Sequence, residues 1–182
     1  MNRITIPTAR LVLKPLGPEF LETTNAYALD PENTRYMLFL PNRDPEETLS
    51  FLKAAAAEWE KEDPAYYEFA ILYEGRHIGA VSLDLEEGGG ELGWILHRDW
   101  WGNGFAPEAA RAVVEYFSGK GCTHFIAHCD TENTASWRVM EKLGMTRTAE
   151  YGGRKNRADT KESMEYRYEL TVSEAPGEGS RR

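Results

Sequence analysis

A glycine-rich turn joins a strand-like run to a helix-like run in the middle of the chain. Glu91–Leu96 precede it, and Ala109–Phe117 follow it. Pro107 suits the first turn of a helix, where its missing N–H would have no partner, and Glu108 suits the positive end of the helix dipole. A strand, a turn of small residues and a helix start direct several backbone N–H groups at one point. The turn therefore predicts a site for phosphate.

Two common phosphate-binding motifs do not fit this turn. A dinucleotide fingerprint fails because Pro107 stands where the third glycine belongs and no series of βα units follows. A P-loop is excluded because no Gly-Lys-Ser/Thr follows the glycines. A plain connection, in which the glycines serve only the geometry of the turn, stays open as an alternative.

A second polar pattern begins at Asn133. Asn133, Ser136, Met140 and Leu143 fall at positions i, i+3, i+7 and i+10, which is one stripe of a helix. The stripe starts polar and ends apolar, as a surface that meets a mixed ligand would. The simpler interpretation is that Asn133 caps the helix and Ser136 lies in its first turn.

Together these segments resemble the GNAT acetyltransferases. Trp101-Gly102-Asn103-Gly104-Phe105-Ala106 is similar to the family's acyl-CoA pyrophosphate loop, Gln/Arg-x-x-Gly-x-Gly/Ala, with Trp101 in place of Gln or Arg, as in the RimJ/RimL-type branch. The segment from Asn133 to Met145 resembles the family's Asn-x-x-Ser-x-x-x-x-Glu-Lys-Leu-Gly-Phe. The opening from Thr8 to Leu16 resembles its Thr-x-Arg-Leu-x-Leu-Arg-x-Leu start. The resemblance covers about residues 10–170.

The resemblance implies a GNAT fold, a mixed α/β sheet, mostly antiparallel, with helices on both faces. It implies an N-acetyltransferase that passes an acetyl group from acetyl-CoA directly to a primary amine, in a ternary complex. The acceptor would be a protein N-terminus or a small amine. A non-catalytic acyl-CoA-binding sensor or interaction module is the alternative. The implied acetyl-CoA contacts are Ile95, Leu96, Trp101, Gly102, Asn103, Gly104, Phe105, Ala106, Asn133 and Ser136.

Acyl transfer to an amine needs a base, because the amine is mostly protonated at neutral pH. Glu91 is the first candidate, since a glutamate near this place often serves as base in the family. Strand alternation puts it on one face with Gly93, Ile95 and His97, and His97 is the second candidate. A solvated turn residue is the alternative role for Glu91.

The departing thiolate benefits from a proton donor. Many relatives place a tyrosine four residues beyond Ser136, but Met140 stands there and cannot donate. The resemblance to the RimJ/RimL-type branch implies that Ser136 hydrogen-bonds the CoA sulfur and steadies the thiolate. Cys122 and Cys129 are not needed as nucleophiles, because acetyl-CoA is already activated.

Composition excludes several other functions. The 182 residues carry a formal net charge of -9, which argues against general nucleic-acid binding and favours a cationic acceptor. Two cysteines and four scattered histidines give no metal-ligand spacing. No apolar run reaches the roughly 20 residues of a membrane helix, and no apolar leader is seen, so we expect a cytoplasmic protein. A homodimer is left open.

Other polar side chains are expected to be structural. His77, His124 and His128 lie in strand-like runs, where packing is the commoner role. Arg154, Lys155, Arg157 and Lys161 form a basic patch, for which a solvated loop is favoured over contact with the acceptor or the CoA phosphates.

The elements that must position these groups follow the order βααβββαβαββ. Expected strands are 9–14, 66–73, 76–85, 91–96, 124–129, 145–151 and 163–170. Expected helices are 19–29, 44–61, one after the glycine-rich turn and 133–143. Residues 1–172 are predicted to form one domain, and residues 173–182 a disordered polar tail.

Overall fold

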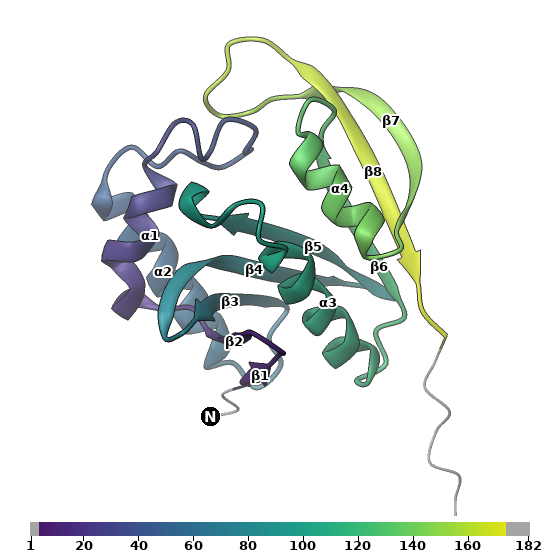
Figure 1. The fold of residues 1–182 in the computed structure, drawn as a ribbon, viewed down its shortest axis with the longest axis horizontal. Helices are drawn as coiled ribbons and strands as arrows, with labels where there is room; N and C mark the ends of the chain where they lie inside the picture. Colours follow the sequence, from purple (N-terminus) through teal and green to yellow (C-terminus); the bar gives the residue numbers. More distant parts are fainter. Residues whose placement is uncertain (1–3, 174–182) are drawn as a thin grey trace, which may run out of the picture.

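The computed structural model describes residues 4–173, which form one mixed sheet with helices on both faces (Figure 1). In this part of the chain the strand order is β1-β2-β3-β4-β5-β6-β8-β7, and only β5 and β6 pair in parallel. The fold class predicted from the sequence is confirmed. The strands are β1 (Ile6–Pro7), β2 (Leu11–Pro15), β3 (Tyr66–Tyr73), β4 (Arg76–Glu86), β5 (Gly89–Leu96), β6 (His124–Asp130), β7 (Thr146–Arg154) and β8 (Ser163–Thr171).

The α-helices begin and end close to their predicted limits. They are α1 (Leu21–Ala28), α2 (Pro45–Trp59), α3 (Phe105–Ser118) and α4 (Thr134–Lys142), with 3₁₀ turns η1 (Pro18–Phe20) and η2 (Arg98–Trp100). The Asp44 carboxylate caps α2 by accepting from the backbone N–H of Glu47 at 2.8 Å. This is the cap that the Asp-Pro-Glu-Glu sequence predicts.

Two predictions differ from the structure at the N-terminal end. Strand β1 was not predicted, because two residues that include Pro7 are too short to show an alternating pattern. The first predicted helix is divided into η1 and α1. All but the first residue of the expected tail, residues 174–182, lies outside the described residues.

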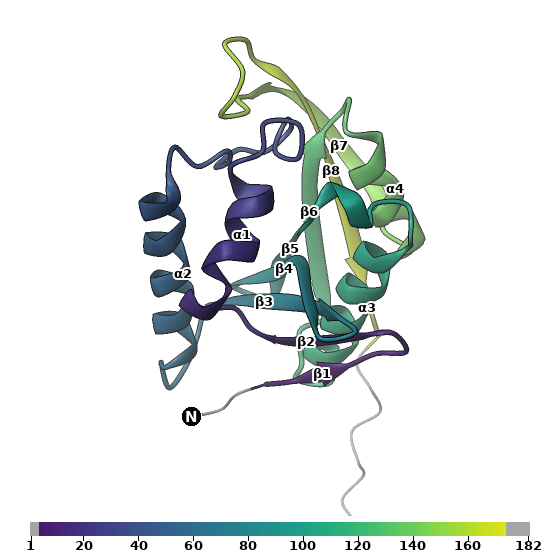
Figure 2. The same cartoon turned by 60° about the vertical axis from the view of Figure 1, so that its left-hand side comes forward.

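The helices cover opposite faces of the sheet (Figure 2). Helix α3 buries Phe105, Ala109, Val113 and Phe117, which repeat every four residues and therefore share one face. That face packs on the sheet in the main core. On the other face, α2 buries Leu52 in a smaller cluster, together with Leu16, Phe20, Ala70 and Ala80.

Strands β5 and β6 touch only at their beginnings. Gly90 pairs with Phe125 and Glu91 with Ile126, and beyond these pairs the two strands separate (Figure 1). A close approach at this point requires glycine, because a Cβ on Gly89 would lie 2.6 Å from the His124 carbonyl oxygen. The sheet thus opens along β5, with β6, β8 and β7 on the far side.

Glu68 is a buried acid near the beginning of β3. Its side chain accepts a hydrogen bond from the Tyr66 hydroxyl, and burial raises its pKa from 4.5 to about 7. Between these two values the folded protein holds a proton that the unfolded chain has lost. The free energy of unfolding therefore falls as pH rises through this window.

We predict that Glu68→Gln removes this loss. At pH 8 the variant should be more stable than the parent by a few kcal/mol, since one pKa unit corresponds to about 1.4 kcal/mol. Urea unfolding at pH 5 and pH 8 measures the difference. The exposed Glu60, as Glu60→Gln, is the control. Equal pH dependence in Glu68→Gln and the parent would contradict the assignment.

Candidate active site

A cavity of about 510 Å³ occupies the opening between β5 and β6. Its walls come from β5, β6, the start of α4 and the segment 36–40. Residues predicted for different roles thus line one space, although they come from distant parts of the chain. Those that line it are Glu91, Ile95, Leu96, Trp101, Ala106, Asn133 and Ser136.

Gly102, Asn103, Gly104 and Phe105 do not line this cavity but lie beside it, in the turn that begins α3. The Phe105 side chain is buried against Tyr73, so only its backbone can face a ligand. Gly104 precedes the helix with φ of 75°, a conformation that favours glycine. Within residues 4–173 the backbone N–H groups of 102–106 have no hydrogen-bond acceptor, which fits the predicted phosphate site.

Arg10, which immediately precedes β2, holds this turn in place. Its guanidinium pairs with Glu108 at 2.7 Å, donates to the Asn103 carbonyl at 2.9 Å and lies over the Phe105 ring. The Thr8 hydroxyl donates to the same carboxylate at 2.6 Å. Burial acts to raise the pKa of Glu108, but the bonds from Thr8 and Arg10 outweigh it and lower the pKa. Glu108 therefore serves mainly to join the turn to β2.

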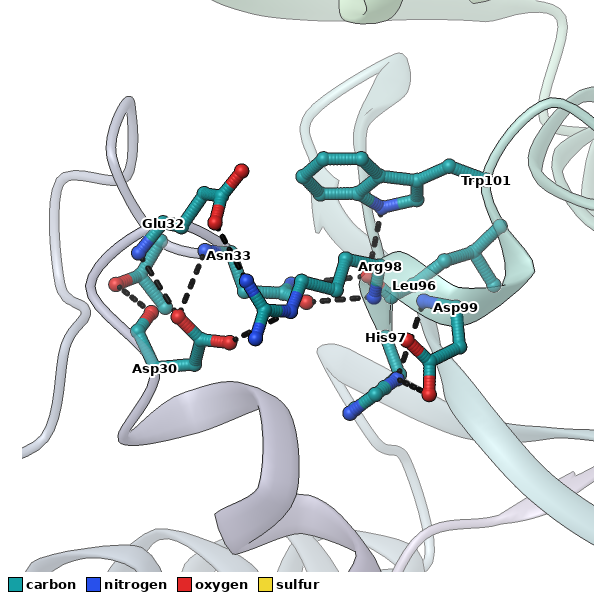
Figure 3. Close-up of polar contacts among 9 residues, drawn as sticks. Asp30, Glu32, Asn33, Leu96, His97, Arg98, Asp99 and Trp101 are labelled. Carbon is teal, nitrogen blue, oxygen red and sulfur yellow. Dashed lines mark hydrogen bonds and ion pairs between the residues drawn. The ribbon is translucent and has the colours of Figure 1, made fainter.

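The end of β5 is fixed by Asn33, as Figure 3 shows. Its amide donates to the Leu96 carbonyl at 2.9 Å and accepts from the Arg98 N–H at 2.7 Å. Arg98 also pairs with Asp30 and Glu32. The Trp101 indole donates to the same Leu96 carbonyl at 3.0 Å. That carbonyl is thus engaged within the protein, and Leu96 contributes its other atoms to the cavity.

His97, the second candidate for the base, lies apart from Glu91. Its ring accepts from the Asp99 N–H and lies 3.6 Å from the Asp99 carboxylate, at the start of η2 (Figure 3). It is absent from the cavity lining, whereas Glu91 is present. The chain turns after Leu96, so the strand alternation that grouped His97 with Glu91 ends before it.

The partner of Glu91 is His128. Nδ1 of His128 on β6 lies 2.7 Å from Oε1 of Glu91 on β5, and both side chains line the cavity. The sequence analysis placed His128 among the packing histidines. A signal was present, because Phe125, Ala127 and Cys129 alternate as buried residues and leave His128 on the opposite face. His77 does follow the packing expectation, since it contacts Phe20 and Tyr27.

The α4 side of the cavity carries Asn133 and Ser136. The side-chain carbonyl oxygen of Asn133 accepts a hydrogen bond from the Ser136 backbone N–H at 3.2 Å, so Asn133 caps the helix. The buried Cys129, whose thiol is free, also lines the cavity. Burial raises the pKa of that thiol to about 12, which agrees with the view that Cys129 is not a nucleophile. Met140 is buried beneath this surface.

The loop between β7 and β8 closes one end of the cavity. Arg154 is buried, donates to the Tyr36 carbonyl at 2.8 Å and pairs with Glu165. Arg157 donates to the Phe39 carbonyl and pairs with Glu47 at 2.9 Å. The expectation of a solvated basic loop is therefore wrong for Arg154, which is buried, whereas Arg157 makes these contacts while exposed. Their partners lie far away in the sequence, so no local pattern indicates them.

A buried polar cluster at the end of β6 holds the same loop. Asp130, which ends β6, accepts from Asn156 at 2.7 Å and from Ser163 at 2.6 Å. Burial would raise the pKa of Asp130, but these bonds and Arg154 lower it overall. The carboxylate thus stays charged and holds the loop to the strand that carries His128.

Comparison with known proteins agrees with this geometry. A family model described as Acetyltransferase (GNAT) domain matches residues 10–146. The uncharacterized N-acetyltransferase p20 of Bacillus licheniformis is 29% identical over 144 residues, covering 76% of this chain and 80% of that protein. FsC-acetyl coenzyme A-N(2)-transacetylase of Aspergillus fumigatus is 29% identical over 188 residues, covering 93% of this chain and 77% of its own length.

A solved structure shares the fold as well. RimL, a ribosomal L7/L12 alpha-N-protein acetyltransferase in complex with coenzyme A, matches with a TM-score of 0.83 at 16% identity, covering 93% of this chain and 98% of that one. Fold, cavity and relatives together define an acetyl-CoA-dependent acyltransferase. The chain belongs to the GNAT acetyltransferase family. Between residues 4 and 173, no helix is both long and apolar enough to cross a membrane.

The turn before α3 gives a direct test. Gly104→Val should weaken CoA binding, because a β-branched side chain is strained at φ of 75° and would crowd the N–H groups that face a phosphate. Calorimetric titration with CoA measures the effect. Gly121→Val is the control, since Gly121 also has positive φ but follows the other end of α3. If both folded variants bind CoA equally well, the turn is not the phosphate site.

Proposed function

We propose that this protein transfers the acetyl group of acetyl-CoA directly to a primary amine, with both substrates bound at once. The observation that carries the proposal is that Glu91 of β5 and Ser136 of α4 line one cavity, beside N–H groups of the α3 turn that have no acceptor within residues 4–173. The acceptor is a protein N-terminus or a small amine. A cytoplasmic location and a homodimer stay predictions.

The residues around the cavity fit an extended, partly anionic substrate. The N–H groups of 102–106 would hold the pyrophosphate, where the dipole of α3 favours negative charge. Beyond Glu91, the edge of β5 has no strand partner in the described chain. Its free peptide groups would receive the pantetheine arm in the way that a sheet edge receives an added strand. Ile95, Leu96, Trp101 and Asn133 would line this path.

Glu91 and Ser136 would assist the two halves of the reaction. The C–N bond forms only after the ammonium loses a proton, and Glu91 supplies the base, directly or through a group hydrogen-bonded to it. The C–S bond then breaks, and the CoA sulfur takes up a second proton. The Ser136 hydroxyl would stabilise the thiolate as it forms. The Asn133 side chain accepts a hydrogen bond from the Ser136 backbone N–H. This bond fixes the backbone position from which the Ser136 hydroxyl projects.

Carboxylates and an apolar segment both border the cavity. Asp84 lies opposite Glu91 in the sheet, and Glu32 and Glu132 also line or border the opening. The rim is the segment 37–40, in which the Phe39 side chain is 81% exposed. An ammonium group joined to an apolar body matches both features, because the charge meets carboxylates and the apolar part covers Phe39.

The first experiment measures thiol release from acetyl-CoA with a panel of amines. The panel pairs apolar and polar small amines, and peptides with free and blocked N-termini. We expect thiol release that depends on the amine and is faster with the apolar amines. In Phe39→Ala the KM for these apolar amines should rise, while the KM for acetyl-CoA should stay unchanged. CoA binding without release for any amine would instead indicate the non-catalytic acyl-CoA-binding module.

Ser136→Ala tests the role of the hydroxyl. It should lower kcat more than it raises the KM for acetyl-CoA, because the hydroxyl acts mainly on the thiolate that develops during the reaction. Thr134→Ala, at the start of the same helix, is the control. An unchanged kcat in Ser136→Ala would leave Ser136 with a structural role only.

A further inference from the structure

The contact between Glu91 and His128 spans the opening of the sheet. Glu91 belongs to the last pair that β5 and β6 share, and His128 lies two residues beyond Ile126, the partner of Glu91 in that pair. Nδ1 of His128 faces the carboxylate at 2.7 Å. No protein group of residues 4–173 hydrogen-bonds Nε2 of the same ring. The imidazole is therefore oriented through one nitrogen while the other is left for a ligand.

This arrangement has the parts of an oriented general base. A carboxylate that accepts the Nδ1–H of a neutral histidine fixes its tautomer and leaves Nε2 as the proton acceptor. The carboxylate also stabilises the imidazolium that forms. Both side chains border the cavity, and each is partly accessible, with side-chain exposures of 18% for His128 and 39% for Glu91.

We propose that His128 is a catalytic base of the acetyl transfer and that Glu91 is its positioning residue. Nε2 of His128 takes one proton from the acceptor ammonium, and the neutral amine then forms the C–N bond. The second amine proton leaves with the CoA sulfur as the C–S bond breaks. His128 returns its proton to solvent. The inference rests on the proposed function and assigns its base to a particular atom.

The charges around the pair support a base that works near neutral pH. The hydrogen bond that His128 donates to Glu91 raises the pKa of His128 above its usual value, while burial opposes this change. Glu165 on β8 raises the pKa further, and Arg167 on the same strand lowers it. Asp84 faces Glu91 from β4, and the Tyr151 ring of β7 lies 6.3 Å from the imidazole.

A base must be neutral to act, so kcat/KM should rise with pH through the raised pKa of His128. His128→Asn keeps an N–H donor for Glu91 but has no atom at the Nε2 position. We expect a loss of roughly 10²–10⁴-fold in kcat/KM and the disappearance of this pH step. Glu91→Gln should lose less activity and move the step to lower pH, since the carboxylate no longer supports the imidazolium. Steady-state kinetics from pH 5.5 to 9, with an amine that the parent acetylates, measures both.

His124→Asn is the matched control. His124 lies on the same strand and pairs with Glu169 at 3.1 Å, away from the cavity lining, so its kinetics should resemble those of the parent. CoA titration shows whether His128→Asn still folds and binds, and His128→Gln provides a second variant. NMR of the imidazole signals of the free protein should show a pKa for His128 that is raised in the parent and lower in Glu91→Gln.

The outcomes separate the two proposals. If the parent releases no thiol in an amine-dependent way, the proposed function itself is wrong. If the parent is active, and His128→Asn binds CoA and keeps most of the parent's kcat/KM, only the proposed role of His128 is overturned. A large loss of kcat/KM in Glu91→Gln together with a small loss in His128→Asn also overturns the role of His128, because Glu91 would then take the proton directly. An NMR titration of His128 that Glu91→Gln does not move also contradicts the pairing.

Discussion

Two register pairs, Gly90 with Phe125 and Glu91 with Ile126, join the halves of the described sheet between β5 and β6. A twisted sheet that continued to pair along this line would bury the edge of β5 and leave no room for a ligand. Because the pairing stops after two residues, the strands diverge and their facing groups line a cavity. Glu91 stands at the point of divergence, where it is still close to β6. The same constraint therefore produces both the opening and the contact between Glu91 and His128.

An opening in a sheet has a structural cost, and polar contacts at its margins offset it. At one margin, Arg10 joins the segment just before β2 to the turn before α3 through Glu108 and Asn103. At another, Arg154 and Arg157 join the β7–β8 loop to the segment that follows α1. A buried guanidinium is unfavourable unless it is paired and hydrogen-bonded, and Arg154 meets both conditions. These contacts keep the two sides at a fixed separation without filling the space between them.

The electrostatics of the cavity follow from the same arrangement. The positive end of α3 lies beside the cavity, and the carboxylates of Glu32, Glu91 and Glu132 line it. In the proposed function, an anionic substrate and a cationic one would be drawn to different parts of this space. The proposed transfer requires that their reactive ends meet near Glu91, His128 and Ser136. The net charge of -9 adds a general attraction for cations that falls off with salt.

The sequence by itself determined the type and order of most elements, the glycine-rich turn before α3 and the family. These depend on local features, such as the cap at Asp44, the glycine at 104 and the spacing from Asn133 to Leu143, and each acts within a few residues of itself. Only the tertiary structure decided that His128 meets Glu91, 37 residues away, that Asn33 fixes the end of β5 from 65 residues before Arg98, and that Arg154 binds the Tyr36 carbonyl across 118 residues. A histidine or arginine in a strand or loop has the same local pattern whether it faces water or a distant carboxylate. Its partner is set by how the strands diverge and how the loops cross, which no short stretch of sequence contains.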